Sequence, residues 1–211
     1  MKLKSGLEIP KPRELILGFV KSGYPIYDGV KVAVDNELRV IEIALSIMLN
    51  SQISGNTGGE IYNRKKPIEE ALKKIPADVD LLTILPGETI PGLEGIAEAV
   101  DEMCSIHRVK LSVSTKILHK KRPYLIPIFD SWVESQYYRL IPGHSNMEYG
   151  EYCNAMVRLV HEDMISVKQE LLDLCKMLKK NGTPMTPLRV LNAMTWAVRS
   201  GNADYYQKLA K

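Results

Sequence analysis

The chain has 211 residues, of which 45% are hydrophobic and 25% are charged, and its net charge is +3. This composition is typical of a globular protein and excludes a disordered chain. No run of about 18 apolar residues occurs, and the first nine residues lack the apolar stretch of a secretory signal, so we expect neither a membrane span nor secretion. The three cysteines are odd in number and widely separated, which predicts no disulfide framework and favours a cytoplasmic protein.

The N-terminal part of the chain is expected to contain one helix and one hairpin. Apolar residues at helical spacing predict a helix that begins near Pro12 and ends at Gly23. Asp28-Gly29 lies between two short runs of residues typical of strands, a pattern that predicts a β-hairpin. This hairpin is the only β-structure that we expect.

A long helix is expected next. With Asp35 or Asn36 as its N-cap, apolar residues recur at helical spacing up to Gly55. Residues 55–59 then form a polar, glycine-rich break. They follow a helix and do not lead into the Lys and Ser or Thr that end a phosphate-binding loop, which excludes a nucleotide site of that kind.

The rest of the chain is expected to form helices separated by short connections. Helical spacing predicts them at about residues 67–75, 78–85, 93–107, 112–119, 147–163, 166–180 and 186–200. Pro123 and Pro127 exclude a helix over residues 120–129, which we expect to form a loop. Either Asp130 or Ser131 should cap the helix that follows. Together these elements predict an all-α fold.

The charge of the chain is unevenly distributed. Between Glu102 and Asp130 there are six basic residues and no acidic one, so this segment carries +6 and the rest of the chain −3. The six are Arg108, Lys110, Lys116, Lys120, Lys121 and Arg122. Such a concentration of positive charge is typical of a surface that binds phosphates, and the alternative is a charged helix and loop exposed to solvent.

Several kinds of catalytic and metal site find no support in the sequence. The four histidines do not have the spacing of metal ligands, and His161-Glu162 is not followed by the second histidine of a zinc-protease motif. There is no Gly-x-Ser-x-Gly motif, and no cysteine lies beside a base in the sequence. We therefore expect no metal or other cofactor, and acyl-transfer chemistry is not indicated.

Residues 107–133 contain the pattern that points to a function. Their order is the end of a helix, a basic turn, a short helix, a proline-containing loop, Asp130 and another helix. This order resembles the helix-hairpin-helix DNA glycosylase superfamily, in which a hairpin binds the phosphate backbone and a proline-containing loop leads to a catalytic aspartate. The resemblance implies a glycosylase-like helical bundle with Asp130 as its catalytic carboxylate.

A second segment is similar to the same family. Residues 49–54, Leu-Asn-Ser-Gln-Ile-Ser, resemble the family's Leu-Ser-x-Gln-Thr, whose glutamine in many members probes the duplex near the extruded base; this implies that role for Gln52. The two stretches span residues 38–140, about half of the chain. We expect one helical domain of residues 1–211, either undivided or in two lobes, with residues 38–140 as a core that carries the hairpin and the chain ends as the second lobe.

The sequence departs from the family at three positions. Arg108 and Lys110 replace the Gly-x-Gly turn that lets hairpin amides approach a phosphate. Either these charged side chains take over the contact, or the hairpin no longer binds DNA. The lysine with which bifunctional members form an imine corresponds to Ser112, which implies a monofunctional glycosylase.

Two roles fit Asp130. Hydrolysis of an N-glycosidic bond builds positive charge on the sugar, which a carboxylate can stabilise while it orients or deprotonates a water molecule. The alternative is a helix N-cap, worth about 0.5–2 kcal/mol of stability. Aromatic side chains near the basic segment either stack on an extruded base or fill the core. They are Tyr124, Phe129, Trp132, Tyr137 and Tyr138.

The leading hypothesis is a DNA-binding protein similar to monofunctional base-excision DNA glycosylases, with double-stranded DNA as its partner. Asp130 would hydrolyse the N-glycosidic bond, Gln52 would probe the duplex, and the six basic residues would bind phosphates. Two alternatives retain the fold without catalysis: a nucleic-acid-binding module, which the missing hairpin glycines favour, and a protein-interaction module. Whether Asp130 faces an open pocket distinguishes these hypotheses.

Overall fold

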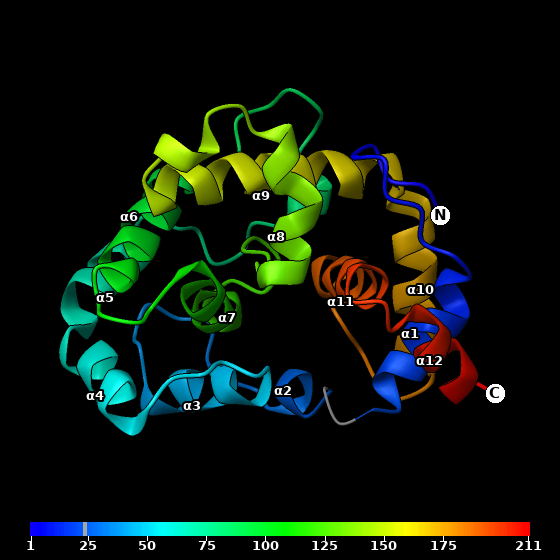
Figure 1. Cartoon of the computed structure of the whole chain (residues 1–211), viewed down its shortest axis with the longest axis horizontal. Coiled ribbons are helices and arrows are strands. Elements are labelled where there is room, and N and C mark those ends of the chain that lie inside the picture. Colours follow the sequence, from blue (N-terminus) through cyan, green and yellow to red (C-terminus); the bar gives the residue numbers. More distant parts are fainter. Residues whose placement is uncertain (23–24) are drawn as a thin grey trace.

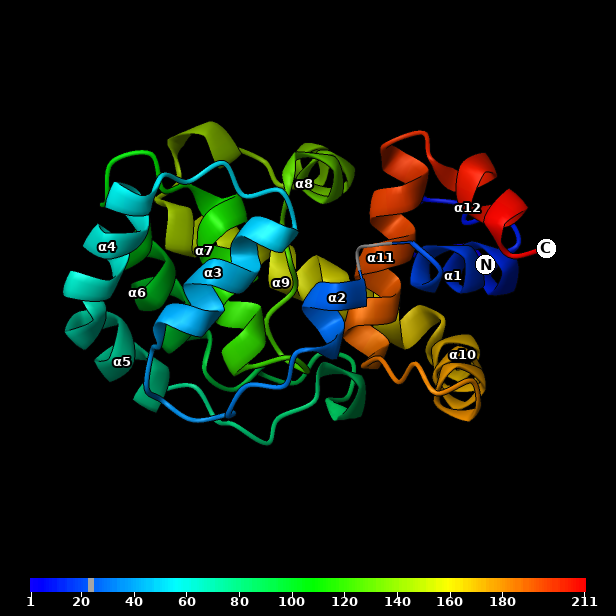
Figure 2. The ribbon, with the colours of Figure 1, turned by 90° about the horizontal axis from the view of Figure 1, so that it is seen from below.

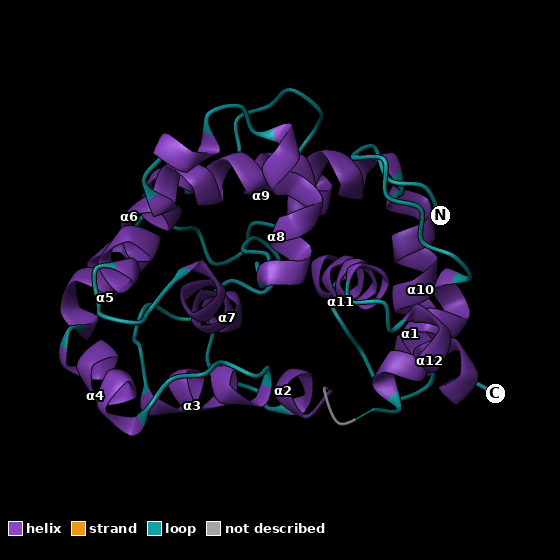
Figure 3. Cartoon of the chain, in the orientation of Figure 1, coloured by secondary structure: helices purple, strands orange, loops and turns teal. Residues whose placement is uncertain are grey.

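The computed structural model describes residues 1–22 and 25–211, and over these residues the protein is all helical, with no β-strand (Figure 3). The all-α prediction is confirmed. The helices are α1 (Pro12–Val20), α2 (Pro25–Gly29), α3 (Val40–Met48), α4 (Gly55–Asn63), α5 (Lys65–Lys73), α6 (Leu93–Cys104), α7 (Leu111–Lys121), α8 (Ser131–Tyr137), α9 (Tyr149–Ser166), α10 (Lys168–Lys180), α11 (Pro187–Arg199) and α12 (Ala203–Leu209). Short 3₁₀ turns cover Leu81–Thr83, Tyr138–Leu140 and His144–Asn146.

The helices form two groups that the long helix α9 connects (Figure 1). Helices α3 to α7 lie at one end of the molecule, and α1, α10 and α12 lie at the other, with α8 and α11 between them (Figure 2). Helix α1 packs on α11 and α12, so the two ends of the chain belong to the same group. Helix α9 packs on α6 in the first group and on α10 and α11 in the second.

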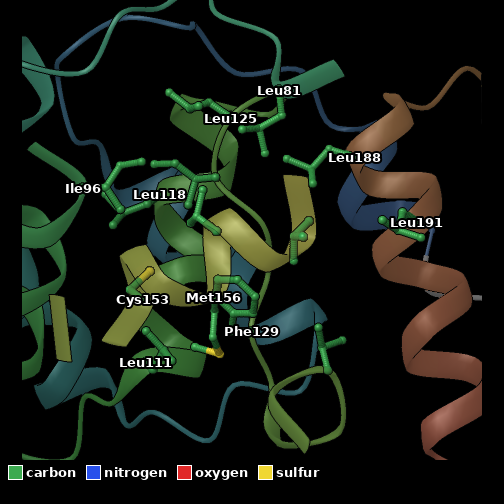
Figure 4. Close-up of a cluster of buried hydrophobic side chains, with 14 of the residues drawn as sticks. Leu81, Ile96, Leu111, Leu118, Leu125, Phe129, Cys153, Met156, Leu188 and Leu191 are labelled. Atoms are coloured by element: carbon green, nitrogen blue, oxygen red, sulfur yellow. The ribbon is translucent and has the colours of Figure 1, made fainter. Parts of the chain in front are cut away.

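One continuous apolar core runs through both groups. Ile96 of α6, Leu118 of α7 and Met156 of α9 are fully buried in it, and Phe129 joins them from the loop before α8 (Figure 4). Leu188 extends the same core to α11. Burial of such side chains stabilises the fold by roughly 1.5–3 kcal/mol each, which fixes α7, α8 and α11 relative to one another. Among the described residues, no helix is long and apolar enough to cross a membrane.

The prediction of a hairpin at Asp28-Gly29 is wrong. Both residues belong to helix α2, and the Asp28 carboxylate forms an ion pair with Arg189 of α11 instead of supporting a turn. The first helix ends at Val20, and the predicted stop at Gly23 lies outside the described residues.

The start of α3 also differs from the prediction, which placed its N-cap at Asp35 or Asn36. The N-cap is Arg39. The two expected caps are engaged elsewhere, because Asp35 forms ion pairs with Arg39 and Lys121 while the Asn36 side chain accepts a hydrogen bond from Arg122. Lys121 and Arg122, at the end of α7, thus bind Asp35 and Asn36 in place of the local capping interaction.

Two further boundaries are corrected. Helix α3 ends at Met48, and the break predicted at residues 55–59 is the start of helix α4, whose N-cap Ser54 accepts a hydrogen bond from the Thr57 amide. The helix predicted at residues 78–85 is reduced to a 3₁₀ turn that Asp80 caps. Helices α6, α7, α9, α10 and α11 lie where helical spacing places them, within a few residues at each end.

Candidate functional site

A pocket of about 320 Å³ lies where α7, α8 and α11 meet the loop after α3. It brings together three of the positions that the family resemblance selects, because Gln52 from the loop, Ser112 from α7 and Asp130 from the start of α8 all line it. These residues are far apart in the sequence. Its other polar and aromatic lining residues are Asn50, Lys116, Ser131, Trp132, Arg189, Asn192, Trp196 and Phe19.

Asp130 is both an N-cap and a pocket residue, so its two predicted roles are compatible. Its Oδ1 accepts hydrogen bonds from the backbone amides of Trp132 and Val133, each at 3.0 Å, which confirms the N-cap. The other oxygen, Oδ2, accepts none from the described residues. Burial raises the pKa of Asp130 above its ordinary value, while the Val133 amide and the Lys116 ammonium oppose this effect.

Lys116 lies one helical turn after Ser112 and lines the same pocket. Its side chain is 4% exposed, and its Nζ donates a hydrogen bond to the carbonyl oxygen of Leu49 at 2.7 Å. Burial lowers the pKa of this lysine, and the nearby charge of Asp130 partly offsets that shift. Lys116 is therefore a pocket residue, not part of an exposed phosphate-binding surface.

Arg189 supplies a second buried cation to the pocket and is 6% exposed. Its Nε donates to the Asp28 carboxylate at 2.7 Å, and its guanidinium lies 5.4 Å from the Phe19 ring centre and 5.8 Å from that of Tyr27. Burial would lower its pKa, but the ion pair with Asp28 outweighs this effect and raises it. The terminal nitrogens Nη1 and Nη2 have no acceptor among the described residues.

The aromatic residues lie in the pocket, in the core or, in the case of Tyr124, at the surface. Trp132 lines the pocket and is 48% exposed, and Trp196 lines it from α11. Phe129 and Tyr137 are buried in the core instead. Gln52 is exposed, and its amide forms no hydrogen bond within the described residues. The pocket thus has aromatic surface and a free amide at its opening.

Four of the six basic residues are buried, Lys116 and three others, and burial contradicts the prediction that these three others bind phosphate. Lys120, Lys121 and Arg122 are 8%, 0% and 1% exposed. Lys120 donates to two backbone carbonyls, Lys121 forms ion pairs with two carboxylates, and Arg122 donates to five oxygen atoms. These contacts attach two other parts of the chain to α7. One is the segment between α2 and α3, and the other is the end of α5. The alternative of a solvated surface is equally wrong for these three.

Arg108 and Lys110 are the two basic residues of the segment that remain exposed, in the turn between α6 and α7. Arg108 has φ +69°, the left-handed region that glycine adopts most easily. Lys110 is the N-cap position of α7 and forms no side-chain capping bond. The turn therefore has a backbone shape suited to glycine at a position where the resemblance implies one.

No local signal in the sequence marks Arg189, Asn192 and Trp196, which line the pocket, as site residues. They lie on one face of α11, but nothing local indicates that this face meets α8 across about 60 residues of intervening chain. A signal did exist for Lys116. It follows Ser112 by four residues, and residues with that separation share one face of a helix.

Residues 24–199 match the model of DUF6308, a family of unknown function, so the chain belongs to this family. The match includes every element that lines the pocket except α1. No curated protein and no solved structure matches the chain. Within residues 1–22 and 25–211, no three His, Cys, Asp or Glu side chains are grouped as metal ligands.

Proposed function

We propose that this member of the DUF6308 family binds duplex DNA and hydrolyses the N-glycosidic bond of a base held in the pocket, with Asp130 as the catalytic carboxylate. The observation that supports this most strongly is the position of Asp130. Its Oδ1 is fixed by two amides, its Oδ2 accepts no hydrogen bond from the residues that the structure describes, and the residue lines a pocket with Gln52 and Ser112. A residue that served only as an N-cap would not need this pocket.

The proposed reaction requires a carboxylate in this setting. As the bond between the base and the sugar breaks, its electron pair leaves with the base and positive charge develops on the sugar. Oδ2 of Asp130 would stabilise this charge and accept a proton from the water that adds to the sugar. The base leaves with the electron pair and takes up one proton, which balances the one that the water releases, so that the products are the sugar hydroxyl and the neutral base. Lys116 and Arg189 favour the ionised carboxylate, because both lower the pKa that burial raises.

The dimensions and lining of the pocket suit a base extruded from a duplex. Its volume of about 320 Å³ falls at the lower end of the range of small-molecule sites. Trp132 offers a half-exposed ring on which a base can stack, and Gln52 lies at a position to contact the strand left behind. Arg108 and Lys110 on the exposed turn are the side chains we assign to the phosphate backbone.

The assignment to the monofunctional class rests on Ser112 and on the state of Lys116. Serine at the position of the family lysine cannot form an imine. Among the described residues that line the pocket, Lys116 is the one lysine, and its Nζ donates a hydrogen bond to the Leu49 carbonyl. We therefore assign hydrolysis, and not imine formation, to this pocket.

The direct test is base release from duplexes that each carry one damaged or mismatched base. The purified protein should release at least one of these bases and leave an abasic site, so that the strand breaks on a denaturing gel only after hot alkali. A covalent complex trapped by borohydride would contradict the monofunctional assignment, and repeating the trap with Lys116→Gln would identify the amine. No release from a broad set of lesions would contradict catalysis and leave a noncatalytic nucleic-acid-binding protein.

Replacing the two exposed cations should weaken DNA binding in a salt-dependent way. Each phosphate contact contributes about −0.9 to the slope of log K against log salt concentration, so Arg108→Gln with Lys110→Gln should flatten the slope by roughly one to two. Fluorescence anisotropy with a labelled duplex between 50 and 200 mM salt, conditions at which such slopes are commonly compared, measures this change. The control variant Lys179→Gln with Lys180→Gln removes the same charge from exposed positions on α10. Equal slopes in the two variants would show that the turn does not contact phosphate.

A further inference from the structure

We propose that the pocket selects a purine with a carbonyl group at its 6-position, and that Arg189 is the residue that recognises it. This inference rests on the proposed function, because it identifies the class of base that the same pocket takes. The observation behind it is that the buried guanidinium of Arg189 has unused hydrogen-bond donors.

Arg189 is held rigidly with part of its donor capacity unused. Nε is fixed by Asp28, and the Phe19 and Tyr27 rings lie beside the guanidinium. Nη1 and Nη2 have no acceptor in the described part of the chain. Neither nitrogen is fully enclosed by protein atoms. Because Arg189 lines the pocket, we assign these two free donors to a ligand held there. A ligand that supplies two acceptors would satisfy them.

The charge of the site favours a neutral ligand over a phosphate. Lys116 and Arg189 are balanced by Asp130, in the pocket, and by Asp28, in the ion pair behind it. The formal charges cancel, so a phosphate would leave uncompensated negative charge in a partly buried site. A neutral base with hydrogen-bond acceptors avoids this cost and still engages the free donors.

The remaining polar groups indicate which edge of a base the pocket reads. Asn192 is unavailable, because its side chain accepts a hydrogen bond from the Ile128 amide and donates one to the Ile128 carbonyl. Among the buried polar residues that line the pocket, the free donors are therefore those of Arg189 and the remaining protons of Lys116. A 6-keto purine such as guanine or hypoxanthine presents two adjacent acceptors, N7 and O6, which match the fork of an arginine. Adenine presents an amino group in place of O6, so a hydrogen-bond donor of the base would face a donor of Arg189.

The preference can be measured without DNA or catalysis. Both tryptophans of the chain, Trp132 and Trp196, line the pocket, so intrinsic fluorescence reports on its occupancy. Inosine should change this fluorescence saturably and bind roughly tenfold more tightly than adenosine, a ratio within the range of one bidentate contact. Purine riboside, which lacks a 6-substituent, should bind no better than adenosine. Equal binding of inosine and adenosine, or no saturable change with any of these nucleosides, would overturn the inference.

Variants and a separate assay distinguish this inference from the proposed function. Arg189→Lys keeps the charge beside Asp28 but not the fork, so it should reduce the preference for inosine to less than about twofold. Asp80→Asn, which removes a partly buried carboxylate outside the pocket, should retain the preference. If that preference were retained in Arg189→Lys, Arg189 would not be the residue that reads the base. A preference for inosine together with no release of hypoxanthine or any other base from duplex DNA would support this inference and refute the glycosylase function.

Discussion

Asp130→Asn should reduce the single-turnover rate of base release by about a hundredfold to a thousandfold. Most of the DNA affinity should remain. Loss of a group that stabilises transition-state charge has effects of about this size. The amide oxygen of asparagine can still accept the two hydrogen bonds that Trp132 and Val133 donate to Oδ1, so α8 keeps its cap. What disappears is the negative charge of Oδ2. Rates are followed by alkaline strand cleavage, and affinity by anisotropy with the same duplex.

Asp80→Asn provides a matched control for this substitution. Asp80 also caps a turn through a backbone amide, and burial also raises its pKa, but it does not line the pocket. The two variants should therefore show similar small changes in unfolding midpoint, whereas only Asp130→Asn should lose activity. Base release that persisted in Asp130→Asn would remove this residue from the proposed mechanism.

Local patterns in the sequence predicted most of the helices, because the signals that start, continue and end a helix lie within or beside the helix itself. The apolar spacing of α6 and the Thr186 cap with Pro187 at the start of α11 are self-contained signals, and both helices are found there. The start of α3 could not be predicted in this way. Asp35 and Asn36 look like N-caps, but Lys121 and Arg122 reach them across more than 80 residues of chain. Long-range hydrogen bonds to charged groups outweigh a cap worth about 1 kcal/mol.

The site was only partly predictable, for a related reason. Gln52 and Asp130 were identified from motifs, and the structure brings them together in one pocket. The basic segment was misinterpreted because net charge along a sequence does not show which way a long side chain points. Lys120, Lys121 and Arg122 extend inward to backbone oxygens and carboxylates, whereas Arg108 stays at the surface. Arg189 had no local signal, because its role depends on packing between distant helices.

Lys121→Met should destabilise the protein by about 3–5 kcal/mol, because it leaves a buried carboxylate without its partner. Lys121 and Glu42 are both 0% exposed, and Lys121 Nζ lies 3.0 Å from Glu42 Oε1. The same ammonium also donates to the Ala33 carbonyl and to Asp35. Urea unfolding followed by far-ultraviolet circular dichroism gives the free energy of unfolding for the intact chain and the variant.

A second substitution distinguishes an unpaired charge from the loss of packing. Glu42→Gln combined with Lys121→Met removes the buried charge and leaves an oxygen that can accept the hydrogen bond from the Arg39 amide, so the double variant should recover more than half of the lost stability. Lys73→Met, which breaks an exposed ion pair with Glu70, should leave the free energy of unfolding nearly unchanged. If Lys121→Met lost no more stability than Lys73→Met, the buried ion pairs of Lys121 would not stabilise the interior. If the double variant were as unstable as Lys121→Met alone, packing and not charge would explain the loss.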